Sequence, residues 1–185
     1  SVNAIDQFVL RRLENNNIRP SREADRTTLL RRAHFDLIGL PPSPSDVQQF
    51  LQDDQPDAYS RLVERLLASP HYGEKWARHW LDQIRYADSD GYEIDHERPN
   101  AWRFRNWVIE SLNANMPFDQ FTHWQMAGDL IPDATIEQRI ATGMYRCAPL
   151  NREAGTDIEQ SRFEQMANRV STVSTVWLGL SLRCA

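Results

Sequence analysis

Residues 66–87 read LLASPHYGEKWARHWLDQIRYA and contain the clearest helix boundary in the chain. Ser69-Pro70 ends one helical pattern, because the residue before a proline is disfavoured in helical backbone. After this boundary, apolar side chains from Trp76 to Ala87 recur at three- and four-residue steps. This spacing places them on one face of a helix, so the stretch predicts a helix over about 71–87 that directly follows another.

The same periodicity continues along the chain in both directions. Asp25 is a predicted N-cap, and Ser43 with Pro44 and Asp46 reads as a cap that opens a short helix. Further helices are predicted over about 5–13, 25–37, 43–53, 56–67, 101–113, 118–127, 136–144 and 158–182. No convincing strand alternation and no repeat occurs. The predicted fold class is therefore all-α: residues 1–185 form a single multi-helix domain with long connecting loops.

Length and composition exclude several classes of protein. A chain of 185 residues with 41% hydrophobic content can bury one sizeable core, which predicts a globular protein. The net charge of -5 argues against a general nucleic-acid binder, although Arg98, Arg103 and Arg105 form a local basic patch. No apolar run approaches the roughly 20 residues that span a bilayer. Neither a nucleic-acid partner nor a membrane span is predicted.

The segment from Trp76 to Trp107 is the predicted site. It holds four of the six tryptophans of the chain, interleaved with acidic residues and histidines. Large rings belong to cores and carboxylates to solvent, so a segment that mixes them is expected to line a cleft or brace a polar loop. The segment from Leu130 to Asp157 reads as a long connection, for which a functional loop and a surface excursion are equally open interpretations.

The acidic loop inside this segment is a candidate site for calcium, which binds oxygen ligands around a tight turn. Its match to an EF-hand loop is partial, because Tyr86 stands where the first carboxylate ligand belongs. Helix caps and ion pairs with Arg98 or Arg85 are the alternative interpretation. The candidate metal ligands are Asp88, Asp90, Glu93, Asp95 and Glu97.

Other catalytic patterns are weak. His79 lies three residues before Asp82, so a carboxylate on the same helical turn could orient its imidazole, although a structural histidine is the alternative. Asp88 and Asp95 could in principle form the carboxylate pair of a glycoside hydrolase. The chain has no G-x-S-x-G elbow, phosphate-binding glycine loop or H-E-x-x-H zinc helix.

Several motifs spread over most of the chain resemble one family. They are Ile5-Asp6-Gln7-Phe8, FDLIGLPP at 35–42, LLASPHYGEKWARHWLD at 66–82, RYADSDGY at 85–92, PNAWR at 99–103 and VWLGL at 176–180. In these motifs the chain resembles DUF1549, also called PSCyt2, a planctomycete cytochrome-associated domain of unknown function.

The resemblance implies a c-type haem. In that family the final helix leads into a Cys-x-x-Cys-His segment, and Cys184-Ala185 fall where its first two residues would be. Such a segment would anchor haem through two thiols and ligate its iron through the histidine. The candidate cofactor-binding residues are Cys184 and His79, with Trp76 and Trp80 helping to enclose the haem. The last helix is expected to run without a breaker to the end of the chain, which therefore looks truncated at its C-terminus, short of the second cysteine. The family also implies export to the periplasm or cell surface.

Three functions follow from these patterns. The first is the helical part of an exported c-type cytochrome-like multidomain protein, whose partners are the other domains of the same polypeptide and a redox partner. The second is a non-catalytic module that binds a glycan or a protein, for which an exposed Trp102 or Trp107 would be evidence. The third is a carboxylate-based hydrolase, which requires two acids in one pocket and one raised pKa.

Overall fold

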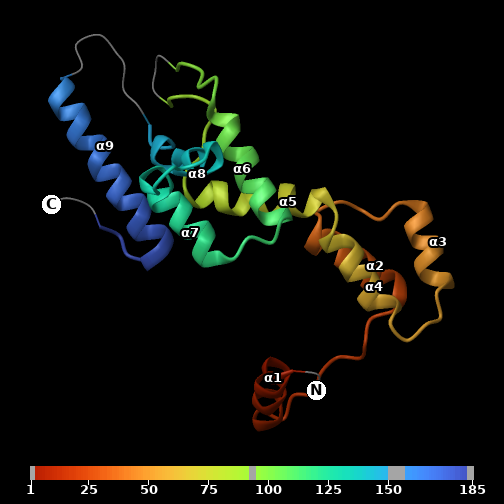
Figure 1. The fold of residues 1–185 in the computed structure, drawn as a ribbon. Helices are drawn as coiled ribbons and strands as arrows, with labels where there is room; N and C mark the ends of the chain where they lie inside the picture. Colours follow the sequence, from red (N-terminus) through yellow and green to blue (C-terminus); the bar gives the residue numbers. More distant parts are fainter. Residues whose placement is uncertain (1–2, 92–94, 150–156, 183–185) are drawn as a thin grey trace.

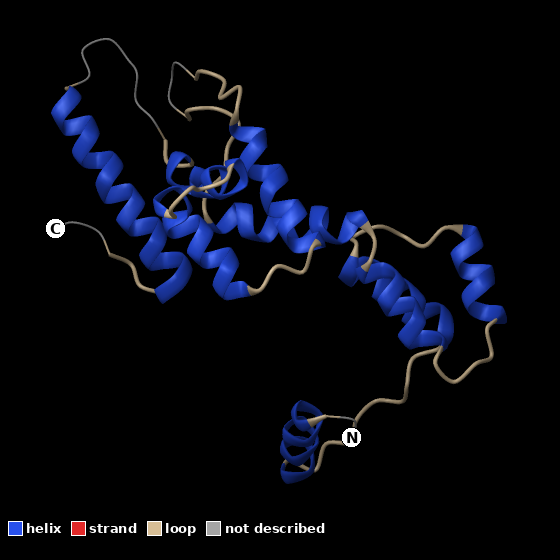
Figure 2. Cartoon of the chain, viewed as in Figure 1, coloured by secondary structure: helices blue, strands red, loops and turns tan. Residues whose placement is uncertain are grey.

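The computed structural model describes residues 3–91, 95–149 and 157–182, and in these ranges it consists of helices joined by loops (Figure 1, Figure 2). The α-helices are α1 (Ala4–Asn15), α2 (Arg26–Leu37), α3 (Pro44–Gln52), α4 (Ala58–Leu67), α5 (Pro70–Gln83), α6 (Ala101–Asn113), α7 (Phe118–Ala127), α8 (Ile136–Ala141) and α9 (Ile158–Val173). The predicted all-α class is confirmed. No helix in these ranges is long and apolar enough to cross a membrane.

The described helices bury two hydrophobic clusters. Figure 1 shows α2, α3 and α4 toward one end of α5 and α6 to α9 toward the other. The smaller cluster joins α2, α3 and α4 through Leu30, Ala33, Phe50, Ala58, Leu62 and Leu66. Two other large apolar residues of α4, Tyr59 and Leu67, are more than 40% exposed. The capping predictions were correct: Asp25 caps α2, and Ser43 with Asp46 forms a capping box on α3.

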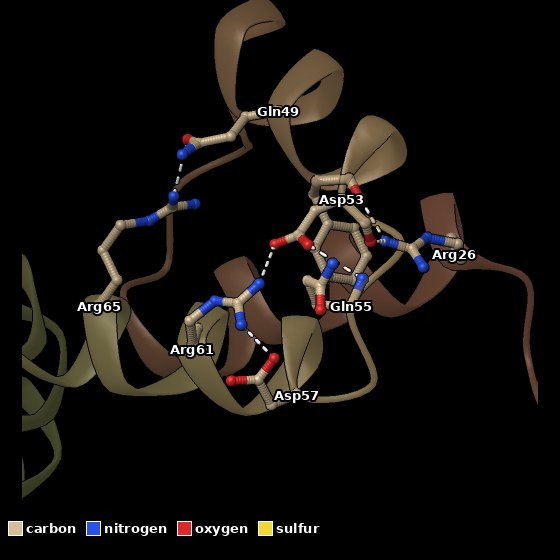
Figure 3. Close-up of polar contacts among 8 residues, drawn as sticks. Arg26, Gln49, Asp53, Gln55, Asp57, Arg61 and Arg65 are labelled. Carbon is tan, nitrogen blue, oxygen red and sulfur yellow. Dashed lines mark hydrogen bonds and ion pairs between the residues drawn. The ribbon is translucent and has the colours of Figure 1, made fainter.

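Arginines hold the three helices of the smaller cluster together (Figure 3). The guanidinium of Arg26 donates to the backbone carbonyls of Phe50 and Asp53 at the end of α3. Arg61 in α4 pairs with the Asp53 and Asp57 carboxylates. These contacts fix the end of α3 to α2 and α4. Apolar packing alone is not directional and would let α3 slide along them.

Helices α5 and α6 approach closely at Gly73. A Cβ atom on this glycine would lie 2.5 Å from the backbone oxygen of Ile109. The Gly73 N–H donates to the Asn113 side chain at 2.8 Å, and the Asn113 amide donates in turn to the Pro70 carbonyl at 3.1 Å. The start of α5 is thereby fixed against the end of α6.

Aromatic rings fill the larger cluster. Trp107 stacks between Phe104 and Phe121, with ring centroids 6.1 and 5.2 Å away. Trp80 meets Phe121 and Trp177 edge to face and donates its indole N–H to the fully buried Gln125 at 2.9 Å. Trp76, predicted on the same face as Trp80, is instead 40% exposed.

Two predicted helices end earlier than expected. Helix α5 stops at Gln83 rather than Ala87, because Arg85 adopts left-handed backbone with φ of 59° and Tyr86 N–H turns back to the Leu81 carbonyl. Helix α9 passes into a π-helical turn, η3 (Ser174–Leu178), which ends at Gly179 with φ of 64°. The expectation of an unbroken helix to Leu182 was therefore wrong.

Helix α1 stands apart from the rest of the described chain (Figure 1). None of its residues is buried, and Ile5, Phe8 and Val9 expose a continuous apolar stripe. The helix was predicted correctly, but its apolar stripe belongs to neither of the two buried clusters. The helix is stabilised locally, by the Asn3 side chain that caps it.

Candidate functional site

The connection between α5 and α6 forms one wall of a pocket. Its first residues are bound to α9, because Arg85 donates to the Thr172 hydroxyl and, at 3.3 Å, to the Asn168 carbonyl. Tyr86 donates its hydroxyl to Asp88, and burial raises the pKa of this phenol above its usual range. Arg85 thus binds the start of the connection to α9, and Tyr86 bonds to Asp88 within the connection itself.

A buried ion pair fixes the acidic loop itself. Asp90 is 1% exposed and accepts a hydrogen bond from Arg98 Nε at 2.8 Å. The same guanidinium donates to the Ala148 carbonyl at 2.7 Å, which joins the loop to the segment that follows α8. Backbone bonds from Asp90 to His96 and from Arg98 to Asp88 close the loop on itself. Arg98 therefore holds the acidic loop and the segment that follows α8 together.

The candidate metal ligands have different surroundings. Asp90 belongs to the ion pair with Arg98, which is the alternative that the sequence left open. Asp95 accepts from Gly91 N–H at 2.8 Å, and this backbone hydrogen bond lowers the pKa of the carboxyl. Glu97 lines the pocket, and Glu93 lies outside the described residues. In the described ranges no three His, Cys, Asp or Glu side chains are grouped so as to hold a metal. Calcium binding by this loop stays a prediction from the sequence.

The candidate haem residues are not brought together by the described part of the chain. His79 is exposed on α5 with its ring centroid 5.4 Å from that of Trp76. Trp177, toward the C-terminus, packs on Trp80 and not on His79. His79 and Trp80 are consecutive residues of α5, so their side chains point about 100° apart around the helix axis. Cys184 lies outside the described residues. Haem binding by His79 and Cys184 therefore stays a prediction from the sequence.

The pocket lies between the α5–α6 connection, the segment from η1 (Gly128–Leu130) to η2 (Thr142–Arg146), and α9. Its volume is about 860 Å³, within the range of pockets that bind organic ligands. Apolar and aromatic groups include Phe104, Met126, Leu130, Ile140 and Tyr145. The charged groups are Arg98, Arg103, Arg139, Arg146, Arg169, Asp90, Glu97 and Asp129. We call this site the arginine pocket.

The charges of the arginine pocket are unbalanced. Arg98 is neutralised by Asp90, but in the described ranges no ion pair is formed by Arg103, Arg139, Arg146 or Arg169. Arg169 donates its Nε to the Tyr145 carbonyl at 3.2 Å. The Arg103 guanidinium lies 5.3 Å from the ring centroid of Trp102, which is 46% exposed. A pocket with an excess of positive charge favours an anion.

Two side chains in the arginine pocket are protonated at neutral pH. Burial raises the pKa of the Cys147 thiol to about 12, so the nucleophilic thiolate is scarce. Burial likewise raises the pKa of Tyr145. The carboxyl pKa shifts resolved in the described ranges, at Asp25, Asp46, Asp53, Asp95 and Glu137, are all downward. None of these five carboxyls lines the arginine pocket, so the hydrolase stays a prediction from the sequence.

Sequence reasoning found only part of this site. It singled out Arg98 and Arg103 as a basic patch and the 130–157 segment as a candidate functional loop. Arg139 and Arg146 come from that segment, whereas Arg169 comes from α9 and carried no signal of its own. Of the two tryptophans proposed as evidence for a binding module, Trp102 is exposed and Trp107 is buried.

The fold and the site define an all-α protein with a positively charged pocket between an inter-helix loop and its last long helix. The chain belongs to the PSCyt2 family, described as a protein of unknown function (DUF1549), whose model matches residues 4–185. This confirms the family that the sequence motifs indicated. No curated protein and no solved structure matches the chain.

Proposed function

We propose that this chain is a non-catalytic ligand-binding module of an exported, cytochrome-like multidomain protein. The observation that carries the binding role is the arginine pocket, whose size suits an organic ligand and whose arginines outnumber their carboxylate partners. The buried Cys147 thiol stays protonated at neutral pH, which argues against this side chain as a nucleophile and supports a binding role for the pocket. The exposed indole of Trp102 offers a stacking surface near the Arg103 side of the pocket.

The binding role can be tested by filling the arginine pocket. Ala148→Trp adds a large ring at a residue that lines the pocket and keeps the carbonyl that accepts from Arg98. Ala114→Trp adds the same ring at an exposed position outside the pocket lining, and serves as the matched control. Saturation-transfer NMR with a mixture of oligosaccharides and small aromatic compounds should detect ligands of the wild type and of Ala114→Trp that Ala148→Trp no longer binds. If no compound distinguishes the two variants, the pocket is not the binding site.

The cytochrome association rests on a different observation, the family itself. Its name, PSCyt2, supports a link to cytochromes, and export would suit the attachment of haem outside the cytoplasm. In this proposal the chain is the helical casing beside a haem-bearing segment, and its partners are the other domains of the same polypeptide and a redox protein.

Expression of the gene to its native stop codon tests the association. The host should export the protein and attach haem covalently, and the visible spectrum should be recorded after a denaturing wash. A retained Soret band supports covalent haem and an electron-transfer role. A colourless protein that is exported and correctly processed contradicts the haem proposal and leaves the binding role standing.

A further inference from the structure

The arginine pocket contains positive charge that the described chain does not neutralise. Once Asp90 is assigned to Arg98, four arginines remain against Glu97 and Asp129. Like charges gathered in a partly enclosed space repel each other more strongly than on an open surface, because less water screens them. A bound anion would relieve this repulsion, so the pocket is electrostatically prepared for one.

Arg169 is the best-placed anion ligand. It is partly buried on α9, and its Nε bond to the Tyr145 carbonyl fixes the plane of the guanidinium. Its two terminal nitrogens make no hydrogen bond within the described ranges. Neither of them is among the fully buried polar atoms that lack a hydrogen bond. They therefore face accessible space. A guanidinium held in this way can give two parallel, charge-assisted hydrogen bonds to a carboxylate or a sulfate.

The remaining lining excludes a bare inorganic ion as the best occupant. Met126, Leu130 and Ile140 present apolar surface to a pocket of about 860 Å³, which is many times the volume of one ion. Filling such a space with water around a small anion would leave that surface hydrated. An apolar body attached to the anionic group would cover it.

We propose that the arginine pocket binds an organic anion, with its carboxylate or sulfate group on Arg169. The apolar body lies against Met126, Leu130 and Ile140. This inference rests on the proposed binding function and adds the chemical class of the ligand. It distinguishes an anionic ligand from the neutral glycan that a stacking surface alone would accept.

A matched pair of fluorescent dyes tests the ligand class. 8-Anilinonaphthalene-1-sulfonate carries a sulfonate on an apolar body, and N-phenyl-1-naphthylamine has the same body without the charge. The variants are Arg169→Gln and Arg146→Gln in the pocket, with Arg162→Gln as the control, because Arg162 is exposed on the same helix as Arg169 and does not line the pocket. Ala148→Trp reports which part of each dye signal comes from the pocket, since other apolar surface, such as that of α1, can also bind dye.

The expected result separates charge from shape. Arg169→Gln should weaken pocket binding of the sulfonate dye about tenfold, as expected for one lost charge-assisted contact, and leave the neutral dye unchanged. Arg146→Gln should act in the same direction, and Arg162→Gln should match the wild type. Added salt should weaken the sulfonate dye alone.

Three other results would overturn the inference, and each can be distinguished from the others. Equal pocket affinities for both dyes, unchanged by either pocket variant, would refute the anion and leave the binding function intact. Dye signals that Ala148→Trp does not reduce would refute the pocket as a binding site altogether. Equal losses of both dyes in Arg169→Gln would mean that this arginine only supports the structure, and would also refute its role as an anion ligand.

Discussion

Replacement of Trp80 by alanine should destabilise the protein by about 4 kcal/mol. Truncating a large aromatic ring in a core typically costs about 3–5 kcal/mol, and the incomplete burial of Trp80 reduces that contribution. A second contribution brings the expected loss of stability back to about 4 kcal/mol, because the Trp80 N–H donates to the amide oxygen of Gln125. Gln125 is fully buried, so losing this donor adds roughly 1–3 kcal/mol.

Two further variants separate these contributions. Trp80→Phe keeps an aromatic ring near Phe121 and Trp177 but removes the N–H, so it should cost about 1–2 kcal/mol. Trp102→Ala removes the same side chain from an exposed position and should cost at most about 1 kcal/mol. Urea denaturation measures all three, through the midpoint at unchanged slope. A loss below about 1 kcal/mol for Trp80→Ala, or one equal to that of Trp102→Ala, would refute the reasoning.

Three other variants test separate parts of the fold. Burial lowers the pKa of His34 from its ordinary 6.5, so the unfolded chain binds a proton before the folded chain does as the pH falls. The free energy of unfolding should therefore drop between about pH 7 and pH 5. His34→Leu should flatten this pH dependence in urea denaturation. Arg98→Met removes the guanidinium from a carboxylate that is 1% exposed and should lower the free energy of unfolding by about 3–5 kcal/mol. Gly73→Ala gains about 1 kcal/mol of helix propensity but places a Cβ against the backbone oxygen of Ile109, so a net loss of about 1–2 kcal/mol is expected in thermal unfolding.

Each of these predictions has an internal control. The double variant Arg98→Met with Asp90→Leu should recover much of the loss, because no carboxylate is then left buried without the guanidinium. His71→Leu is the matched control for the loss of an imidazole, because His71 is exposed and, within the described ranges, pairs with Glu74 on the same helix. A stabilised Gly73→Ala variant would show that α5 and α6 can move apart at no cost, which their close contact argues against.

Local patterns predicted the helices well where the deciding chemistry is local. Asp25 and Ser43 were identified as caps because their side chains bond to backbone within three residues, and both bonds are present. The end of α5 was missed for the opposite reason. Ile84 continues the apolar spacing and is indeed buried, but it reaches the core from a turn that Arg85 makes in left-handed backbone. A non-glycine residue in that conformation gives no signal in the sequence.

The arginine pocket shows where sequence reasoning ends. Asp90 and Arg98 are eight residues apart, and their ion pair was among the alternatives stated from the sequence. Arg169 lies about seventy residues further on and joins the pocket only because α9 packs alongside the other walls. A single sequence carries no information about such a distant approach. The place of Arg169 in the pocket became visible only with the three-dimensional fold.

The isolation of helix α1 has a consequence for its lifetime. A helix of 12 residues without tertiary contacts is marginal in water, so α1 should open and close many times while the larger core stays folded. Its amide protons should therefore exchange with deuterium quickly, whereas those around Ala77 and Val108, in the packed α5–α6 pair, should exchange only when the core itself unfolds. The apolar stripe of Ile5, Phe8 and Val9 is thus present as an ordered surface for only a fraction of the time.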